Sequence, residues 1–219
     1  MMNWKQLISA KRFGMEEFHE ERQENRSEFQ RDYDRLIFSA PFRRLQNKTQ
    51  VFPLPGSVFV HNRLTHSLEV ASVGRSLGDD VAKALLERHP ELQDSFLPEI
   101  GSIVSAACLA HDLGNPPFGH SGEKAISTFF SEGKGVRLKE KQPNGEQLSP
   151  MEWEDLTHFE GNANAFRILT HQFEGRRKGG FVLTYTTLAS IVKYPFSSSL
   201  AGTKSKFGFF VSEEESFQK

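Results

Sequence analysis

The sequence has a single cysteine, Cys108, almost no net charge and no long uninterrupted apolar run. One cysteine excludes a disulfide framework and fits a reducing compartment. A net charge of −1 and a pI near 6.7 argue against a protein that coats nucleic acid, although a local basic pocket stays compatible with them. No stretch has the apolar length that a bilayer requires, and the N-terminus lacks the apolar segment of a signal peptide. We therefore expect a soluble, cytoplasmic protein.

Period-2 alternation and internal repeats are also missing, whereas helical periodicity is frequent, so the predicted fold class is all-α. Ser27 with Gln30, and Ser149 with Glu152, form capping patterns that predict two helix starts. A long helix is expected to end near His89–Pro90, with an apolar stripe directed at the core: Val70, Val73, Leu77, Val81 and Leu85. A second stripe precedes position 111: Ile100, Ile103, Val104, Ala107 and Cys108.

Three regions are expected along the 219 residues. Residues 1–26 are polar and charged, which predicts a solvated helix or arm. Residues 27–195 carry the helical patterns and predict one helical domain. Residues 196–219 place Phe207, Phe209 and Phe210 where little sequence follows to cover them, so this segment is expected to continue in a longer protein.

The segment His111–Glu123 gathers two imidazoles and two carboxylates among glycine and proline residues. His111 continues the apolar stripe before it and is therefore expected to point inward. Gly114 suits a helix C-terminus, and the prolines that follow forbid continuation. Ser121 is expected to cap a second helix, which carries Ile126, Phe129 and Phe130 inward and has His120 and Glu123 at its start.

His66 lies one turn before Val70, so two helices each direct a histidine toward the core. A lone histidine on an apolar stripe is more often a satisfied core residue than a ligand. Two buried imidazoles beside Asp112, however, would both be satisfied by one shared metal ion.

Four blocks in order resemble the HD-domain metal-dependent phosphohydrolases and, within them, the bacterial deoxyguanosine triphosphate triphosphohydrolases. The blocks are Phe42–Val51, Arg63–Ser67, His111–Glu123 and His158–Asn162, and the resemblance covers essentially the whole chain. It implies an HD-type helical bundle that hydrolyses a deoxynucleoside triphosphate to a deoxynucleoside and inorganic triphosphate with a divalent metal ion (Mg²⁺, Mn²⁺ or another transition metal). Relatives are larger homo-oligomers, hexameric in known cases, and some respond to single-stranded DNA, for which the charge balance here gives no independent support.

The resemblance makes His66, His111 and Asp112 metal ligands, and His120 and Glu123 the catalytic pair. It makes Gln50 a reader of the deoxyribose 3′-hydroxyl and Arg63 a phosphate contact. Further substrate contacts are expected from residues of the same blocks: Arg43, Lys48 and Asn115. The family's fourth ligand is an aspartate on a later helix that this chain does not reach, which predicts that the chain alone has little activity.

Two other interpretations stay open. The chain could act on nucleoside monophosphates or on a cyclic or alarmone nucleotide, as other phosphohydrolases of this superfamily do. It could also be a non-catalytic nucleotide-binding or assembly module.

Overall fold

The computed structural model describes residues 3–17, 26–48, 62–141, 147–175, 178–201 and 206–219. Within these ranges the regular structure is helical, and extended pairing is limited to two isolated bridges, Arg12 with Thr184 and Ser197 with Phe209. The predicted all-α fold class is confirmed. In the same part of the chain, no helix combines the length and the apolar character that crossing a bilayer demands.

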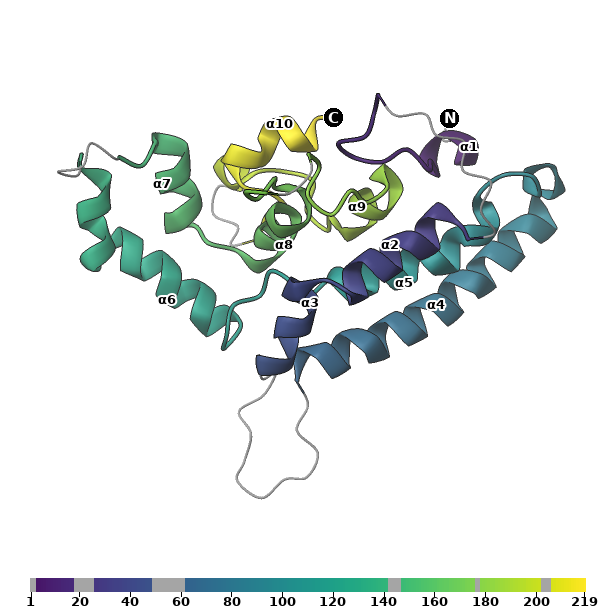
Figure 1. The fold of residues 1–219 in the computed structure, drawn as a ribbon, viewed down its shortest axis with the longest axis horizontal. Helices are drawn as coiled ribbons and strands as arrows, with labels where there is room; N and C mark the ends of the chain where they lie inside the picture. The colour runs from purple at the N-terminus through teal and green to yellow at the C-terminus, as the bar shows by residue number, and fades with distance from the viewer. Residues whose placement is uncertain (1–2, 18–25, 49–61, 142–146, 176–177, 202–205) are drawn as a thin grey trace, which may run out of the picture.

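The α-helices follow one another along the chain as in Figure 1: α1 (Trp4–Leu7), α2 (Glu28–Ile37), α3 (Ala40–Arg44), α4 (Arg63–Arg88), α5 (Ile100–Ala110), α6 (His120–Ser131), α7 (Pro150–Thr157), α8 (Gly161–Thr170), α9 (Tyr185–Ile191) and α10 (Glu214–Phe217). Short 3₁₀ turns lie between them: η1 (Leu45–Asn47), η2 (Pro90–Leu92), η3 (Leu97–Glu99), η4 (Lys134–Lys139), η5 (Ser198–Leu200) and η6 (Val211–Glu213).

Both predicted capping patterns start helices. The Ser27 hydroxyl accepts a hydrogen bond from the Gln30 amide at the start of α2. At α7, Ser149 and Glu152 exchange both bonds of a capping box, and Pro150 occupies the first turn, where its missing N–H costs nothing. These starts were predictable because each bond joins residues three positions apart.

Helix α5 lies between α2 and α4 (Figure 1). It packs along α4 on one side and contacts α2 and α9 on others. The core around it holds phenylalanines and alanines together with six fully buried leucines: Leu36, Leu45, Leu109, Leu113, Leu169 and Leu183. Helices α6 and α7 pair at the opposite end of the molecule, and α8 lies between the two groups.

The predicted inward face of α4 is wrong for three of its five residues, whereas Val70 and Leu85 are half-buried and Leu85 packs on a buried cluster. Val73, Leu77 and Val81 are 60%, 61% and 51% exposed. The buried face consists of mostly small residues instead: Arg63, Ser67, Ala71, Gly74, Gly78 and Ala82. The reason is the close approach of α4 to α5, where a Cβ on Gly78 would lie 2.8 Å from the Cα of Gly101. Only small side chains fit between backbones at that distance.

Two local predictions for α6 also need correction. The helix is preceded by Gly119 at a φ of 54°, and no side chain caps it, so Ser121 is not the cap. Phe129, expected to point inward, is 46% exposed. Helix α6 packs on α7 and η4 rather than on the main core, so Phe129 is not covered by that core.

The charged N-terminal region is not a solvated arm over residues 8–13. Ile8, Arg12 and Phe13 are buried. The Arg12 guanidinium donates to Asp32 at 2.7 Å and to the Val182 carbonyl at 2.6 Å. The polar composition of this segment could not predict the burial of Arg12, because a buried, paired arginine cannot be distinguished from an exposed one in the sequence alone.

The C-terminal aromatic residues are buried too, contrary to the expectation that they lack cover. Phe207, Phe209 and Phe210 are only 3–4% exposed. Phe207 and Phe210 pack with Ala163 of α8, and Phe209 stacks on Phe217 with ring centroids 4.0 Å apart. The segment 206–217 therefore folds back over α7 and α8.

Candidate active site

His66 and His111 come together at one end of the α4–α5 pair. His66 lies in the first turn of α4, His111 directly follows α5, and their ring centroids are 5.3 Å apart. One ligand atom from each histidine and one from Asp112 all lie within 4.8 Å of one another. The histidines are half-buried and Asp112 is buried, so these groups form a clustered donor set rather than scattered surface residues.

The hydrogen bonding of His111 fits this donor set to a cation. Its Nδ1 lies 2.6 Å from the Cys108 carbonyl, which can only accept, so Nδ1 carries the proton. In the neutral ring Nε2 then carries no proton and is an acceptor. This atom lies 3.4 Å from Oδ1 of Asp112. Two lone pairs at that distance repel unless a proton or a metal ion lies between them. This is the arrangement in which a metal-binding histidine is fixed by its other nitrogen.

Two neighbours donate hydrogen bonds to Asp112, and Lys48 lies next to one of them. Arg63 donates to Oδ2 at 2.8 Å, and the Asn115 side-chain amide donates to Oδ1 at 2.5 Å. Lys48 donates to the Asn115 carbonyl at 2.8 Å. Burial and the positive charge of Arg63 lower the pKa of Lys48, against the opposite effect of Asp112. Three of the residues predicted to contact substrate thus lie around the predicted metal ligand.

His120 and Glu123 form a hydrogen-bonded pair on the first turn of α6. His120 Nδ1 lies 2.8 Å from Glu123 Oε2, while the His120 side chain is 82% exposed. The Gly161 amide donates to the other carboxylate oxygen at 2.9 Å. Burial alone would raise the pKa of Glu123, but the bonds from His120 and Gly161 and the charge of Lys206 hold it below the usual value. The carboxylate is therefore suited to hold a proton on Nδ1 of His120.

Gly161, at the start of α8, lies between the surroundings of Asp112 and the His120–Glu123 pair. A Cβ at this position would clash with Oδ1 of Asn115 and would lie 2.8 Å from Oε1 of Glu123. Asn115, which donates to Asp112, and Glu123 therefore approach the same backbone position, and glycine is what allows both to do so.

Lys206 and Glu160 also belong to this neighbourhood, and the sequence did not single out Lys206. Its ammonium lies 2.8 Å from Glu160 and 3.4 Å from Glu123. Glu160 caps α8 by accepting hydrogen bonds from the amides of Asn162 and Ala163. No local signal marked Lys206, because its partners are 46 and 83 residues away in the chain.

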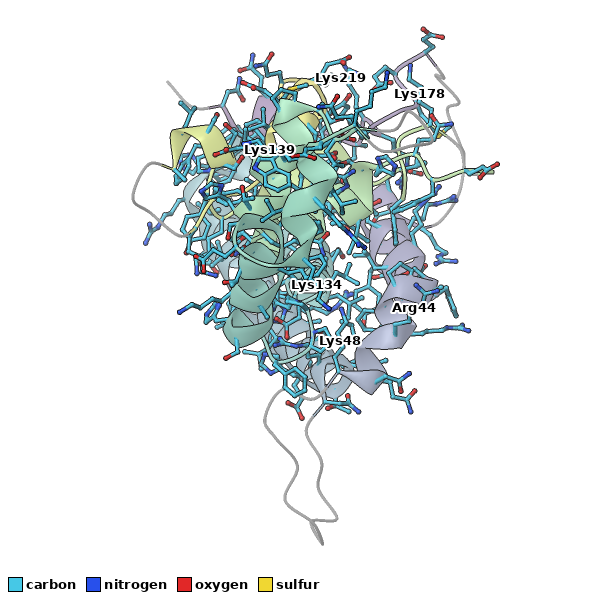
Figure 2. All side chains as sticks on the ribbon, turned by 90° about the vertical axis from the view of Figure 1, so that its left-hand side faces the viewer. Arg44, Lys48, Lys134, Lys139, Lys178 and Lys219 are labelled. Carbon is cyan, nitrogen blue, oxygen red and sulfur yellow. The ribbon has the colours of Figure 1, made fainter. Side chains whose placement is uncertain are left out.

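Two further residues were predicted to contact substrate, Gln50 and Arg43. Gln50 lies outside the described residues. Arg43 and its neighbour Arg44 are exposed on α3. In Figure 2 the labelled basic side chains extend from Arg44 and Lys48 near one end of the molecule to Lys178 and Lys219 near the other, so they do not gather in one patch.

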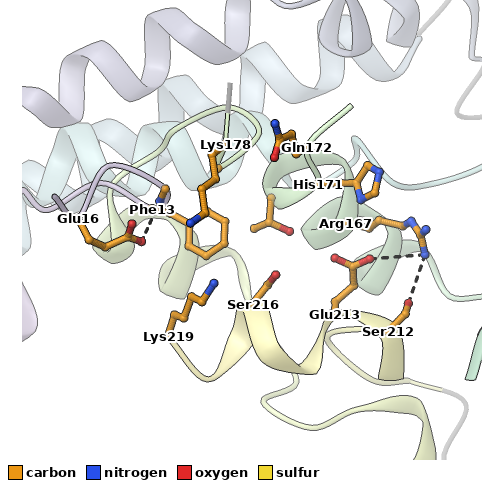
Figure 3. Close-up of a pocket in the computed structure, with 13 residues that line it drawn as sticks. Phe13, Glu16, Arg167, His171, Gln172, Lys178, Ser212, Glu213, Ser216 and Lys219 are labelled. Carbon is orange, nitrogen blue, oxygen red and sulfur yellow. Dashed lines mark hydrogen bonds and ion pairs between the residues drawn. The ribbon is translucent and has the colours of Figure 1, made fainter. Parts of the chain in front are cut away.

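A separate cavity of about 340 Å³ lies between the N-terminal segment and α10 (Figure 3). Its lining shares no residue with the predicted site and includes Arg167, Lys178, Glu213 and Lys219. Burial raises the pKa of Glu213, against the lowering effect of Arg167, whose guanidinium lies 3.5 Å away.

Residues 63–180 match the HD domain family. With its helical fold and the His66–His111–Asp112 cluster, the chain belongs to the HD-domain family. It is 46% identical to a deoxyguanosinetriphosphate triphosphohydrolase-like protein of Synechocystis over 99% of its length and 50% of that relative. Identity is 47% to a protein of the same description from Pseudomonas aeruginosa (97% and 47%), and 37% to a deoxyguanosinetriphosphate triphosphohydrolase of Yersinia enterocolitica (98% and 47%). The resemblance stated from the sequence is confirmed, and the chain spans about half the length of these curated relatives.

Proposed function

We propose that the protein to which this chain belongs is a metal-dependent hydrolase of deoxynucleoside triphosphates, with dGTP favoured, that releases deoxynucleoside and inorganic triphosphate. The observation that carries the proposal is the facing pair of acceptors, Nε2 of His111 and Oδ1 of Asp112, beside His66. Asn115 and Gly161 link this group to the His120–Glu123 pair. The names of the similar proteins favour dGTP as the substrate.

His66, His111 and Asp112 would hold the ion. Two imidazole nitrogens and one carboxylate oxygen suit Mn²⁺ or a neighbouring transition metal, and Mg²⁺ is the alternative. When bound, such an ion lowers the pKa of water and neutralises charge on a phosphate. Three protein ligands leave positions open, as a catalytic site requires.

His120 would supply the proton that the leaving group needs. In the proposed reaction a water oxygen bonds to the α-phosphorus, the bond from phosphorus to the 5′-oxygen breaks, and that oxygen keeps the electron pair. It is a poor leaving group until protonated. Because Nδ1 of His120 donates to Glu123, the protonated ring offers its exposed Nε2–H to the departing oxygen.

The remaining predicted residues would bind substrate. Arg63, Lys48 and Arg43 are proposed to neutralise the triphosphate, Asn115 to contact it, and Gln50 to read the 3′-hydroxyl. Arg63 already orients Asp112, so one guanidinium would serve both the ligand and the phosphate.

Metal content and turnover test this proposal separately. We expect His66→Ala and Asp112→Ala to lose metal by elemental analysis of purified protein. His120→Ala should keep metal and lose turnover. His89→Ala is a matched control, because His89 is an exposed histidine whose ion pair is with exposed Glu91. Unchanged metal stoichiometry in the first two variants would contradict the ligand assignment, and near-normal dGTP hydrolysis by His120→Ala would contradict the proton-donor role.

Product analysis distinguishes the alternatives. Inorganic triphosphate supports the proposal, whereas monophosphate or pyrophosphate indicates another nucleotide phosphohydrolase. Thermal stabilisation by dGTP without metal or turnover indicates a binding module. We propose that the 219-residue chain alone has little activity, since the resemblance places the family's fourth ligand outside it. The same proposal includes residues 27–195 as the catalytic domain, a cytoplasmic location and a homo-oligomeric state. Analytical ultracentrifugation tests the oligomeric state.

A further inference from the structure

Lys206 joins two carboxylates that come from different helices. Its ammonium lies 2.8 Å from Oε1 of Glu160, at the start of α8, and 3.4 Å from Oε2 of Glu123, on α6. The Glu160 side chain is 1% exposed, that of Glu123 is 11% exposed and that of Lys206 is 29% exposed. A lysine so placed has given up much of its hydration, so the two carboxylates are what compensates its charge.

Glu160 is the fixed end of this arrangement. Its carboxylate accepts from the Asn162 amide at 2.6 Å, the Ala163 amide at 3.1 Å and the Asn162 side chain at 2.7 Å. These bonds belong to the cap of α8 and persist whatever occupies position 206. Glu160 therefore positions the ammonium of Lys206, and Lys206 in turn acts on Glu123.

The ammonium contacts the oxygen of Glu123 that faces His120. Lys206 Nζ also lies 3.3 Å from Nδ1 of His120, but an ammonium and an N–H are both donors. The shorter contact, 2.8 Å between His120 Nδ1 and Glu123 Oε2, is consequently the hydrogen bond. Oε2 thus receives two donors, one from the imidazole and one from the lysine.

We propose that Lys206 is a positioning residue of the His120–Glu123 pair: anchored on Glu160, it holds the Glu123 carboxylate ionised and oriented so that His120 keeps its proton on Nδ1 and presents Nε2 to the substrate. This inference rests on the proposed function for its catalytic meaning, but its structural content concerns only these four side chains. The charges of Glu160 and Glu123 also raise the pKa of Lys206 despite its burial, so the lysine stays charged at neutral pH.

A purely structural role explains Lys206 less well. The segment is already anchored by Phe207 and Phe210, which pack with Ala163, and by Asp155, which accepts from the amides of Val211 and Ser212. Attachment of this segment to α7 and α8 does not require a partly buried charge, which is costly to desolvate.

Lys206→Met and Lys206→Arg separate the two roles. The first readout is a ¹³C-carboxyl NMR titration of Glu123, in which Lys206→Met should raise the pKa of Glu123 and Lys206→Arg should restore the wild-type curve. The second is kcat and KM for dGTP in the full-length protein: kcat should fall about 10–100-fold in Lys206→Met with KM within about threefold, and Lys206→Arg should recover most of it. Lys83→Met, at an exposed lysine of α4, is the control for loss of one positive charge.

An unchanged Glu123 titration in Lys206→Met overturns the inference, whatever happens to the melting temperature or to kcat. If Lys206→Met does not fold, Lys206→Gln is read in the same way. If the wild-type protein does not hydrolyse dGTP, the proposed function fails while the titration still decides the role of Lys206, because that readout needs no turnover.

Discussion

Adding a valine side chain at Gly78 should destabilise the protein more than removing most of the side chain of its neighbour Leu77. Gly78 faces Gly101 across the α4–α5 contact, whereas Leu77 is 61% exposed. The apolar stripe in the sequence gives the opposite expectation, because it places Leu77 in the core and leaves Gly78 beside it unremarked. The two substitutions therefore test which face of α4 is buried.

The magnitudes follow from the two environments. A Cβ at Gly78 would lie 2.8 Å from Cα and 3.1 Å from N of Gly101, and backbone atoms cannot rotate away. Overpacking of this kind costs about 1–3 kcal/mol, and the gain in helix propensity over glycine returns only a few tenths. With 61% of Leu77 exposed, about two-fifths of it is buried, which is worth about 0.6–1.2 kcal/mol of the ~1.5–3 kcal/mol for complete burial. We expect Gly78→Val to cost about 1–2.5 kcal/mol and Leu77→Ala about 1 kcal/mol or less.

Urea unfolding followed by far-ultraviolet circular dichroism measures both free energies, with Ser72→Ala at an exposed position of the same helix as the reference. If Leu77 were in the core, its truncation would cost about 2–5 kcal/mol and valine at an exposed position 78 would be nearly neutral. A larger cost for Leu77→Ala than for Gly78→Val would refute the packing of α4 on α5 described above.

Three other substitutions probe the rest of the structure. Arg12→Leu should cost about 3–5 kcal/mol of unfolding free energy, because it leaves the carboxylate of Asp32, which is 0% exposed, without its charge partner; a urea midpoint equal to wild type would contradict this. Phe209→Ala should cost about 3–5 kcal/mol by loss of a buried ring, seen as a lower melting temperature; an unaltered one would mean that the C-terminal segment does not pack as described. Because the pKa of Glu213 is raised above 4.5, its protonated form favours folding below that value, and this stability is lost as pH rises through the folded pKa. Glu213→Gln should therefore gain stability relative to wild type between acidic and neutral pH, and a pH-independent difference in urea midpoint would oppose this interpretation.

What the sequence predicted well is local. The starts of α2 and α7 depend on side-chain bonds to amides three residues away, and such bonds need no tertiary context. The end of α4 before Pro90 is equally local, because a proline restricts the residue that precedes it. The all-α fold class follows from many such segments together.

The meeting of His66 and His111 was anticipated by an argument that the structure only partly supports. The sequence argument placed His66 on a core-facing stripe with Val73 and Leu77, and both of these residues are exposed. His66 reaches His111 because it lies in the first turn of α4, and the start of α4 lies beside the end of α5. The small buried residues Ser67 and Ala71 also allow the two helices to pack closely. Apolar periodicity finds a buried face only when the partner helix is far enough away to admit large side chains.

The parts of the site that sequence could not supply are contacts between distant segments. Lys206 meets Glu123 across 83 residues, and Arg12 meets Val182 across 170. Arg12, Glu123 and Lys206 are charged residues, and residues of this type are mostly exposed. A single sequence carries no record of which distant side chains are paired, so burial of a charged residue cannot be inferred from its neighbours along the chain.

Gly114 shows how a correct local prediction can rest on the wrong cause. Gly114 predicted a helix end because a glycine suits the left-handed conformation that often follows a helix. In the described residues, however, Gly114 is not among the glycines with positive φ. What requires it is crowding: a Cβ at this position would clash with the Gly161 carbonyl and lie 2.8 Å from the Cα of Ala165. Since the Gly161 amide also binds Glu123, a side chain at Gly114 would push α8 away from both the His–Asp cluster and the His120–Glu123 pair. The spacing between the two halves of the proposed active site is therefore set by two glycines at the junction of α5 and α8, which carry no reactive group themselves.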